Sequence, residues 1–187
     1  MGNLGLERLE ALRASEALQA VYQAWRLVAL ARIYGERVLE IGGGTGRTAY
    51  YAHRLGLVDY TIVDLPLANV AQALFLGRTL GPDAISLPGE DAQPGRIRIV
   101  TPAWLLGNQL DFDVVINVDS LTEMSEPEVV SYAELIAKRS RAFLSINHER
   151  NPIRVRDLAL LGRFAVQRSP YWMRKGYVEE FFLQRLI

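Results

Sequence analysis

The sequence has 187 residues, with 21 basic and 21 acidic side chains, two histidines and no cysteine. This length suffices for one domain with a sizeable core. A net charge of zero argues against partners such as nucleic acid or anionic membrane. The lack of cysteine excludes disulfides, a thiolate nucleophile and Cys-ligated metal, and two histidines make a His-rich metal centre improbable, so no metal site is predicted. No apolar run is long enough to span a bilayer, and we therefore expect a soluble cytoplasmic protein.

The predicted elements alternate between helical stretches and short apolar runs. Helices are expected at residues 3–34, in one or two pieces, and then at 47–55, 66–80, 125–138 and 155–161. Strands are expected at residues 37–41, 60–63, 96–100, 112–118, 142–146, 164–168 and 180–186. Residues 82–95 are rich in proline and glycine and are predicted to form a surface loop.

This alternation predicts an α/β fold with a mainly parallel, seven-stranded sheet and helices on both faces. No long helix separates the last two strands, which predicts a hairpin and hence one antiparallel strand. Residues 1–35 are interpreted as an N-terminal helical extension and residues 36–187 as the ligand-binding domain. The extension could close over a binding site, or it could pack on a second copy of the chain in a homo-oligomer.

The densest chemical signal is the segment Glu40-Ile41-Gly42-Gly43-Gly44-Thr45-Gly46, which joins a predicted strand to a helix. Read from Gly44, it fits the G-x-G-x-x-A pattern of dinucleotide-binding proteins, with Asp64 twenty residues further on as a ribose ligand. Read from Glu40, it fits the E-x-G-x-G-x-G pattern of proteins that bind S-adenosyl-L-methionine (SAM). The spacing leaves both cofactors open, although little chain follows the fifth strand to build the substrate-binding part of a dehydrogenase.

The sequence resembles the class I SAM-dependent methyltransferases, and within them the sugar O-methyltransferases. Two segments are general to these enzymes, VLEIGGGTG at 38–46 and YTIVDLP at 60–66. Three are similar to the sugar subgroup, VINVDSLTEM at 115–124, SINHE at 145–149 and SPYWMRKGY at 169–177. The resemblance implies a Rossmann-like methyltransferase fold, SAM as cofactor and transfer of a methyl group to a hydroxyl of a sugar or glycosylated small molecule.

The expected site combines cofactor-binding and acceptor-binding residues. The cofactor set is Glu40, Gly42, Gly43, Gly44, Gly46, Asp64, Leu65, Thr101 and Asn117. His148 is the expected general base, because imidazole titrates near neutral pH, and Glu149 would orient it. Asp119 and Glu123 are expected to bind the acceptor, with a base or divalent-cation ligand as the alternative roles. Tyr171 and Trp172 would stack on a sugar face or pack the terminal hairpin.

Two other functions remain open at this stage. The first is a catalytically silent SAM-binding module that uses its N-terminal helix as an interaction surface. The second is a fragment of an NAD-dependent oxidoreductase. A nucleic-acid methyltransferase is disfavoured by the zero net charge and by the lack of a motif for a flipped base.

Overall fold

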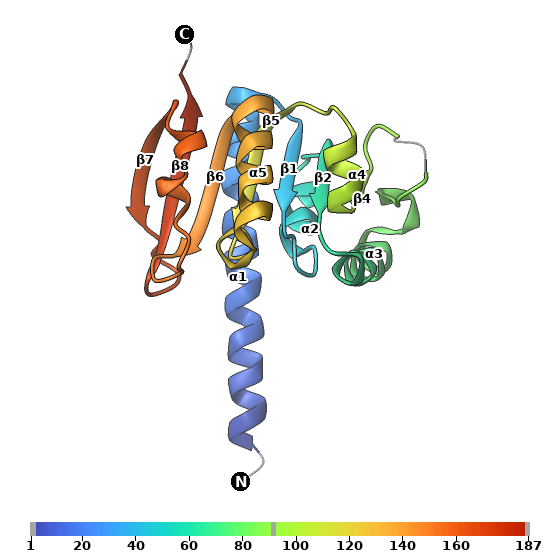
Figure 1. Cartoon of the computed structure of the whole chain (residues 1–187). Helices are drawn as coiled ribbons and strands as arrows, with labels where there is room; N and C mark the ends of the chain where they lie inside the picture. The colour runs from blue at the N-terminus through green and yellow to red at the C-terminus, as the bar shows by residue number, and fades with distance from the viewer. Residues whose placement is uncertain (1–2, 91–92, 186–187) are drawn as a thin grey trace.

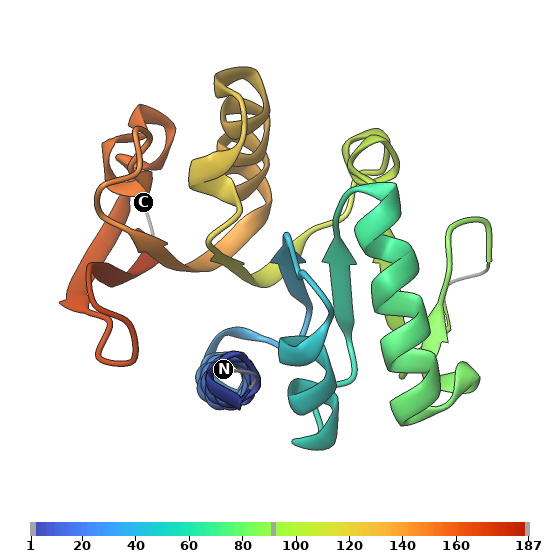
Figure 2. The same cartoon turned by 90° about the horizontal axis from the view of Figure 1, so that it is seen from below.

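The computed structural model describes residues 3–90 and 93–185, with side chains from Ser15 onward. One sheet runs through the molecule, with helices on both of its faces (Figures 1 and 2). The helices are α1 (Asn3–Tyr34), α2 (Arg47–Arg54), α3 (Pro66–Leu80), α4 (Pro102–Gly107) and α5 (Glu126–Arg139). The strands are β1 (Val38–Ile41), β2 (Tyr60–Val63), β3 (Ile85–Ser86), β4 (Ile97–Val100), β5 (Phe112–Val118), β6 (Ser140–His148), β7 (Phe164–Pro170) and β8 (Tyr177–Gln184).

The strand order in the sheet is β3-β4-β2-β1-β5-β6-β8-β7. Every neighbouring pair from β3 to β6 is parallel, whereas β8 is antiparallel to both β6 and β7. The predicted sheet with one antiparallel strand is therefore confirmed. The order of the strands changes direction at β1, since β2 lies on one side of it and β5 on the other. The last residue of β1, Ile41, pairs with Val63 of β2 and Asn117 of β5. The carboxyl ends of these three strands consequently form one edge, where α/β sheets bind ligands.

Two predicted segments differ from the structure. The stretch interpreted as a loop, 82–95, contains a 3-10 turn and the two-residue strand β3, which adds an eighth strand beside β4. The short helix expected at 155–161 is a pair of separate 3-10 turns. Both differences concern very short elements, which carry too few residues to produce a hydrophobic period.

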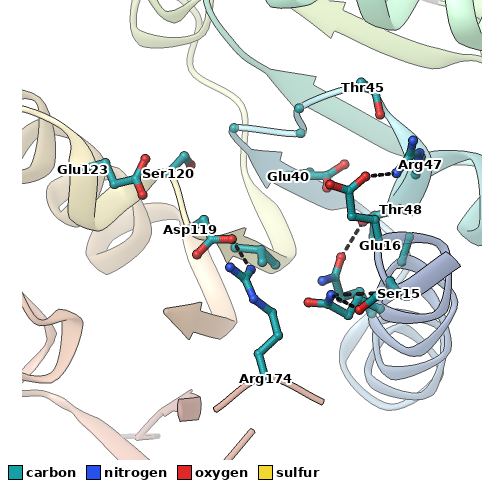
Figure 3. A pocket seen from close by; sticks show the side chains of 17 residues that line it. Ser15, Glu16, Glu40, Thr45, Arg47, Thr48, Asp119, Ser120, Glu123 and Arg174 are labelled. Carbon is teal, nitrogen blue, oxygen red and sulfur yellow. Dashed lines mark hydrogen bonds and ion pairs between the residues drawn. The ribbon is translucent and has the colours of Figure 1, made fainter. Parts of the chain in front are cut away.

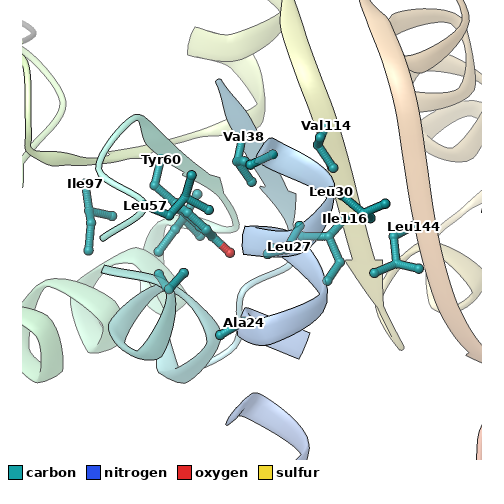
Figure 4. Packing of buried hydrophobic residues seen from close by; sticks show 14 of the residues in the cluster. Ala24, Leu27, Leu30, Val38, Leu57, Tyr60, Ile97, Val114, Ile116 and Leu144 are labelled. Carbon is teal, nitrogen blue, oxygen red and sulfur yellow. The ribbon is translucent and has the colours of Figure 1, made fainter. Parts of the chain in front are cut away.

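The helix α1 is continuous, and its two halves have different surroundings. Its C-terminal half packs on the sheet, where Ala24 and Leu27 are fully buried (Figure 4). Its N-terminal half extends past the carboxyl ends of the parallel strands (Figure 1). Although α1 has 32 residues, no helix in the described parts of the chain is both long and apolar enough to cross a membrane.

Two hydrophobic clusters fill the two sides of the sheet. One joins α1, α2 and α3 to the sheet, and in Figure 4 Leu27 and Leu30 of α1 lie near Val114. The other joins α4 and α5 to the opposite face through Leu105 and Ile136. Burying a leucine or isoleucine side chain fully is worth about 1.5–3 kcal/mol, so the clusters hold the strand ends in fixed positions.

Candidate active site

The glycine loop, residues 42–46, leads from β1 into α2 at the carboxyl edge of the sheet. Gly42 has a φ of 75° and Gly44 a φ of 56°, which is a left-handed conformation that side chains rarely adopt. A Cβ on Gly42 would also lie 1.9 Å from Ser120 Oγ. The glycines therefore allow the loop to approach the segment that follows β5 and leave backbone exposed at the strand edge.

Asp64 is held against this loop at the end of β2. Its Oδ2 accepts hydrogen bonds from Gly44 N at 3.2 Å and Gln72 Nε2 at 2.9 Å, and its Oδ1 accepts from Leu65 N at 2.8 Å. Gln72 Nε2 also donates to the Gly44 carbonyl at 3.1 Å. Burial raises the pKa of Asp64, and these three donors oppose that effect. Gln72 therefore couples the position of Asp64 to that of the glycine loop.

Glu40 lies below the same loop in a nearly closed environment. Its side chain is 4% exposed, and Oε2 accepts a hydrogen bond from Tyr60 Oη at 3.0 Å. Burial raises the pKa of Glu40 to about 7, with a smaller contribution from Asp64, while hydrogen bonds from Tyr60 and Thr48 act in the opposite direction. A carboxyl group in this state can ionise when a cationic ligand group approaches it.

Two cavities meet at the loop and form one cleft along the sheet edge. The larger, of about 700 Å³, lies between the glycine loop, α1, the segment after β5 and Arg174 (Figure 3). The smaller, of about 440 Å³, lies between Asp64, α4 and α5. Both are lined by Gly42, Ser120 and Glu123. A ligand lying along the cleft would pass from the smaller cavity over Gly42 into the larger one.

Most of the residues that line the larger cavity have polar or charged side chains. Its α1 side is formed by glutamines and an acidic residue, and among the described lining residues none is aromatic. Its charged side chains are Glu16, Glu40, Arg47, Asp119, Glu123 and Arg174. Both arginines form ion pairs within it, Arg47 with Glu16 and Arg174 with Asp119. The carboxylates outnumber the arginines, so the cavity favours cationic and hydrogen-bonding ligands.

Asp119 has the most unusual backbone in this cleft. Its φ is 65°, the one positive value outside glycine among the described residues, and Ser120 N donates to Val118 O at 2.8 Å across it. This is a γ-turn of the strained form. Arg174 Nη1 donates to Asp119 Oδ2 at 2.5 Å, whereas Oδ1 is enclosed without a partner in the described structure. Strained residues of this kind cluster at functional sites.

A buried amide network supports the turn from below. Asn117 Nδ2 donates to the Ile41 carbonyl at 3.0 Å and to Ser120 Oγ at 2.6 Å. Asn117 Oδ1 accepts from Leu121 N at 3.3 Å and from Asn147 Nδ2 at 3.0 Å. Asn117 is fully buried and lines neither of the two large cavities. The structure thus places this residue, expected to bind cofactor, as a support for the loops of the cleft.

His148 lies apart from the glycine loop. It lines a third, very small cavity of about 10 Å³ together with Glu149. Its Nδ1 accepts a hydrogen bond from Arg150 N at 3.1 Å, and its ring packs edge-on against Tyr177, with 5.1 Å between the centroids. Glu149 pairs with Arg168, so the expected contact that would orient the imidazole is not formed.

The remaining predicted residues divide between the cleft and the packing around it. Leu65 is 63% exposed and lines the smaller cavity. Thr101 caps α4, its Oγ1 accepting from Trp104 N at 3.3 Å. Tyr171 and Trp172 line none of the three cavities and both pack on Tyr22 of α1.

In the described residues, no group of three or more histidines, aspartates and glutamates is arranged to hold a metal ion. Sequence reasoning missed Gln72, and it did not assign a role to Tyr132, which lines the smaller cavity. Neither residue lies in a motif. Arg174 lies in the segment 169–177 that the resemblance had singled out, which was the available signal for it.

No family model and no curated protein matches this sequence. Among solved structures, the magnesium protoporphyrin IX methyltransferase ChlM from Synechocystis PCC 6803, with bound SAM, has a TM-score of 0.69 at 16% identity, over 93% of this chain and 82% of that chain. A candidate RNA methyltransferase from Pyrococcus horikoshii has a TM-score of 0.62 at 18% identity, over 90% and 85%. An O-methyltransferase family protein from Burkholderia thailandensis has a TM-score of 0.56 at 16% identity, over 92% and 60%. The chain therefore has the Rossmann-like fold of the SAM-dependent methyltransferases.

Proposed function

We propose that the protein is a SAM-dependent methyltransferase that transfers a methyl group to a hydroxyl of a sugar or glycosylated small molecule. The fold supports the cofactor, since the similar ChlM structure holds SAM. The antiparallel strand β8 also supports it, because it distinguishes methyltransferase sheets from ordinary dinucleotide-binding folds.

In this proposal SAM occupies both parts of the cleft. Its adenosine would lie in the smaller cavity beside Asp64 and Leu65. Its methionine part would pass over Gly42, so that Glu40 accepts a hydrogen bond from the cationic amino group. The charges favour SAM over NAD, because the larger cavity has an excess of carboxylates and both of its arginines are already paired, which is unfavourable for a diphosphate.

The acceptor would occupy the part of the larger cavity beyond the sulfonium. Polar and charged side chains around this cavity, with no aromatic ring among its described lining residues, suit a molecule with many hydroxyl groups. The observation that carries this part of the proposal is the strained turn at Asp119, which holds a carboxylate in the same cavity as Glu40 (Figure 3). We assign Asp119 as the general base and Glu123 as a residue that binds the acceptor. His148 is assigned as a residue that positions Tyr177 through the contact between their rings.

The reaction would be an in-line displacement. The acceptor oxygen forms a bond to the methyl carbon while the carbon–sulfur bond breaks, and its electron pair stays on sulfur to give S-adenosylhomocysteine (SAH). The acceptor proton passes to Oδ2 of Asp119, because Oδ1 is enclosed, and then to water. Correct positioning can supply about 7–11 kcal/mol of the barrier, and the base roughly 10²–10⁴ in rate. Arg174 would keep Asp119 in place through their hydrogen bond at 2.5 Å.

The first experiment is a calorimetric titration with SAH, with NADH in parallel, followed by a screen of sugar acceptors for SAH release. We expect the protein to bind SAH with micromolar affinity and not to bind NADH. Asp119→Asn should lower turnover by about 10²–10⁴ and change SAH affinity less than threefold. His148→Gln should lower turnover less than tenfold. Binding of NADH alone would refute the cofactor assignment, and full turnover by Asp119→Asn would refute the acceptor site. Asp83→Asn, at an exposed carboxylate that lines none of the three cavities, is the matched control.

A further inference from the structure

The hydrogen bonds of Asp64 limit what this carboxylate can bind. A carboxylate offers about four acceptor positions on its two oxygens. Gly44 N and Gln72 Nε2 occupy both positions on Oδ2, and Leu65 N occupies one on Oδ1. One position therefore remains, on Oδ1. The ribose of an adenosine ligand presents two adjacent hydroxyl groups, so Asp64 can accept a hydrogen bond from only one of them.

Tyr132 stands on the opposite wall of the same cavity. It belongs to α5, its side chain is 4% exposed, and it lines the smaller cavity together with Asp64. Its ring belongs to the hydrophobic cluster on the α4 and α5 side of the sheet. Its hydroxyl bonds to no described residue and is not among the fully enclosed unpaired atoms. A hydroxyl that is neither bonded to a described residue nor fully enclosed can be presented to the cavity that its residue lines.

The Tyr132 phenol is in the neutral form, which can bind a second hydroxyl. Burial raises the pKa of Tyr132 to about 12, and the nearby Asp64 and Glu128 carboxylates add to this effect. A phenol is neutral near pH 7 even at its ordinary pKa of 10, so the Tyr132 hydroxyl can both donate and accept a hydrogen bond. The influence of Asp64 on this pKa also agrees with the two groups facing the same space.

We propose that the Tyr132 hydroxyl binds the ribose hydroxyl that Asp64 cannot accept. Asp64, at the end of β2, then binds one ribose hydroxyl, and Tyr132 of α5 binds the other within the smaller cavity. This inference rests on the proposed function, since the ribose is that of SAM. It assigns a cofactor-binding role to a residue of the helix after β5, outside the glycine loop and the end of β2.

The test is a calorimetric titration of three ligands, SAH, 2′-deoxy-SAH and 3′-deoxy-SAH, against the wild type and Tyr132→Phe. The substitution keeps the buried ring and removes only the hydroxyl, so the fold should persist. We expect Tyr132→Phe to weaken SAH binding about three- to tenfold, the loss of one neutral hydrogen bond. It should weaken one deoxy analogue by the same factor and leave the other unchanged, because that analogue lacks the hydroxyl that Tyr132 binds.

Two further variants sharpen the result. Asp64→Asn should show the opposite selectivity, weakening the analogue that Tyr132→Phe leaves unchanged. Tyr50→Phe removes a phenol from α2 that lines none of the described cavities, and it should bind all three ligands as the wild type does. Unchanged SAH binding by Tyr132→Phe, or equal weakening of all three ligands, would overturn this inference while SAM binding stands. Failure of the wild type to bind SAH would overturn the proposed function as well.

Discussion

The substitution Glu40→Gln tests whether the cleft holds a carboxylate that lowers the stability of the free protein. Glu40 is 4% exposed, and burial raises its pKa from 4.5 to about 7. The folded state therefore holds this proton more tightly than the unfolded chain does between these two pH values. The free energy of unfolding therefore falls as pH rises through this window, because Glu40 must ionise inside the folded protein. The full reduction is present above pH 7. The shift corresponds to about 3 kcal/mol.

Glutamine at this position keeps an oxygen for the hydrogen bond from Tyr60 Oη but carries no charge. At pH 8 we expect Glu40→Gln to be more stable than the wild type by up to about 3 kcal/mol, or roughly 6–12 °C in Tm for a chain of this size. At pH 4.5 the difference should vanish. Scanning calorimetry of both proteins between pH 4.5 and 8 measures this. A Tm difference that does not change with pH would refute the reasoning.

The same variant should lose ligand affinity. In the proposed complex Glu40 accepts a charge-assisted hydrogen bond from the amino group of SAH, worth about 1.5–3 kcal/mol. We therefore expect Glu40→Gln to weaken SAH binding about 10- to 100-fold at pH 8. The wild-type protein should bind SAH more weakly at pH values under 7, because binding then requires loss of the Glu40 proton. The SAH affinity of the variant should not change in this pH range. Glu134→Gln, at a glutamate near the surface of α5, is the control for both measurements.

Three more substitutions test the loop and the helix α1. Gly42→Ala places a methyl group 1.9 Å from Ser120 Oγ at a φ of 75°, and we expect loss of SAH binding together with a lower Tm. In Gly44→Ala the added methyl group has no neighbour within 4 Å, and the φ at this position is 56°. Backbone strain alone should therefore lower the free energy of unfolding by about 1–2 kcal/mol, which urea unfolding measures. Glu179→Gln weakens the hydrogen bond at 2.9 Å from Arg26 Nε that ties α1 to β8, and should destabilise the protein by about 1–3 kcal/mol in the same assay.

Most of the fold could be predicted because its information is local. The strands β1, β2 and β5 are short, mainly apolar segments that are buried along most of their length, and the glycines that follow β1 mark the change to a helix. The short elements were harder. Helix α4 has six residues, and its only local signals are the cap Thr101 and the following Pro102, whereas the sequence predicts a cofactor contact for Thr101 and no helix here. Tertiary contacts decide such elements.

The candidate site shows the same division between local and distant information. Glu40, the glycines and Asp64 belong to contiguous motifs, and in the structure the glycine loop lies against both carboxylates. Residues brought by packing alone, such as Gln72 and Tyr132, carry no pattern of their own. The position of His148 depends on strand pairing: β8 lies antiparallel to β6 with Tyr177 opposite His148, so the imidazole packs on the hairpin. No spacing in the sequence sets that register.

The two unfavourable features of this fold lie in one cavity, and they separate the candidate functions. Buried Glu40 lowers stability above neutral pH, and its proposed hydrogen bond to the amino group of SAM explains this cost even in a protein that only binds SAM. The strained turn at Asp119 is a second cost, and it places a carboxylate in the part of the cavity proposed for the acceptor, where a silent SAM-binding module needs none. A non-glycine residue persists at positive φ only where the surrounding structure holds it, as Arg174 and the network around Asn117 do here. An enzyme that must hold a base beside the methyl group explains both costs, and the silent module explains one.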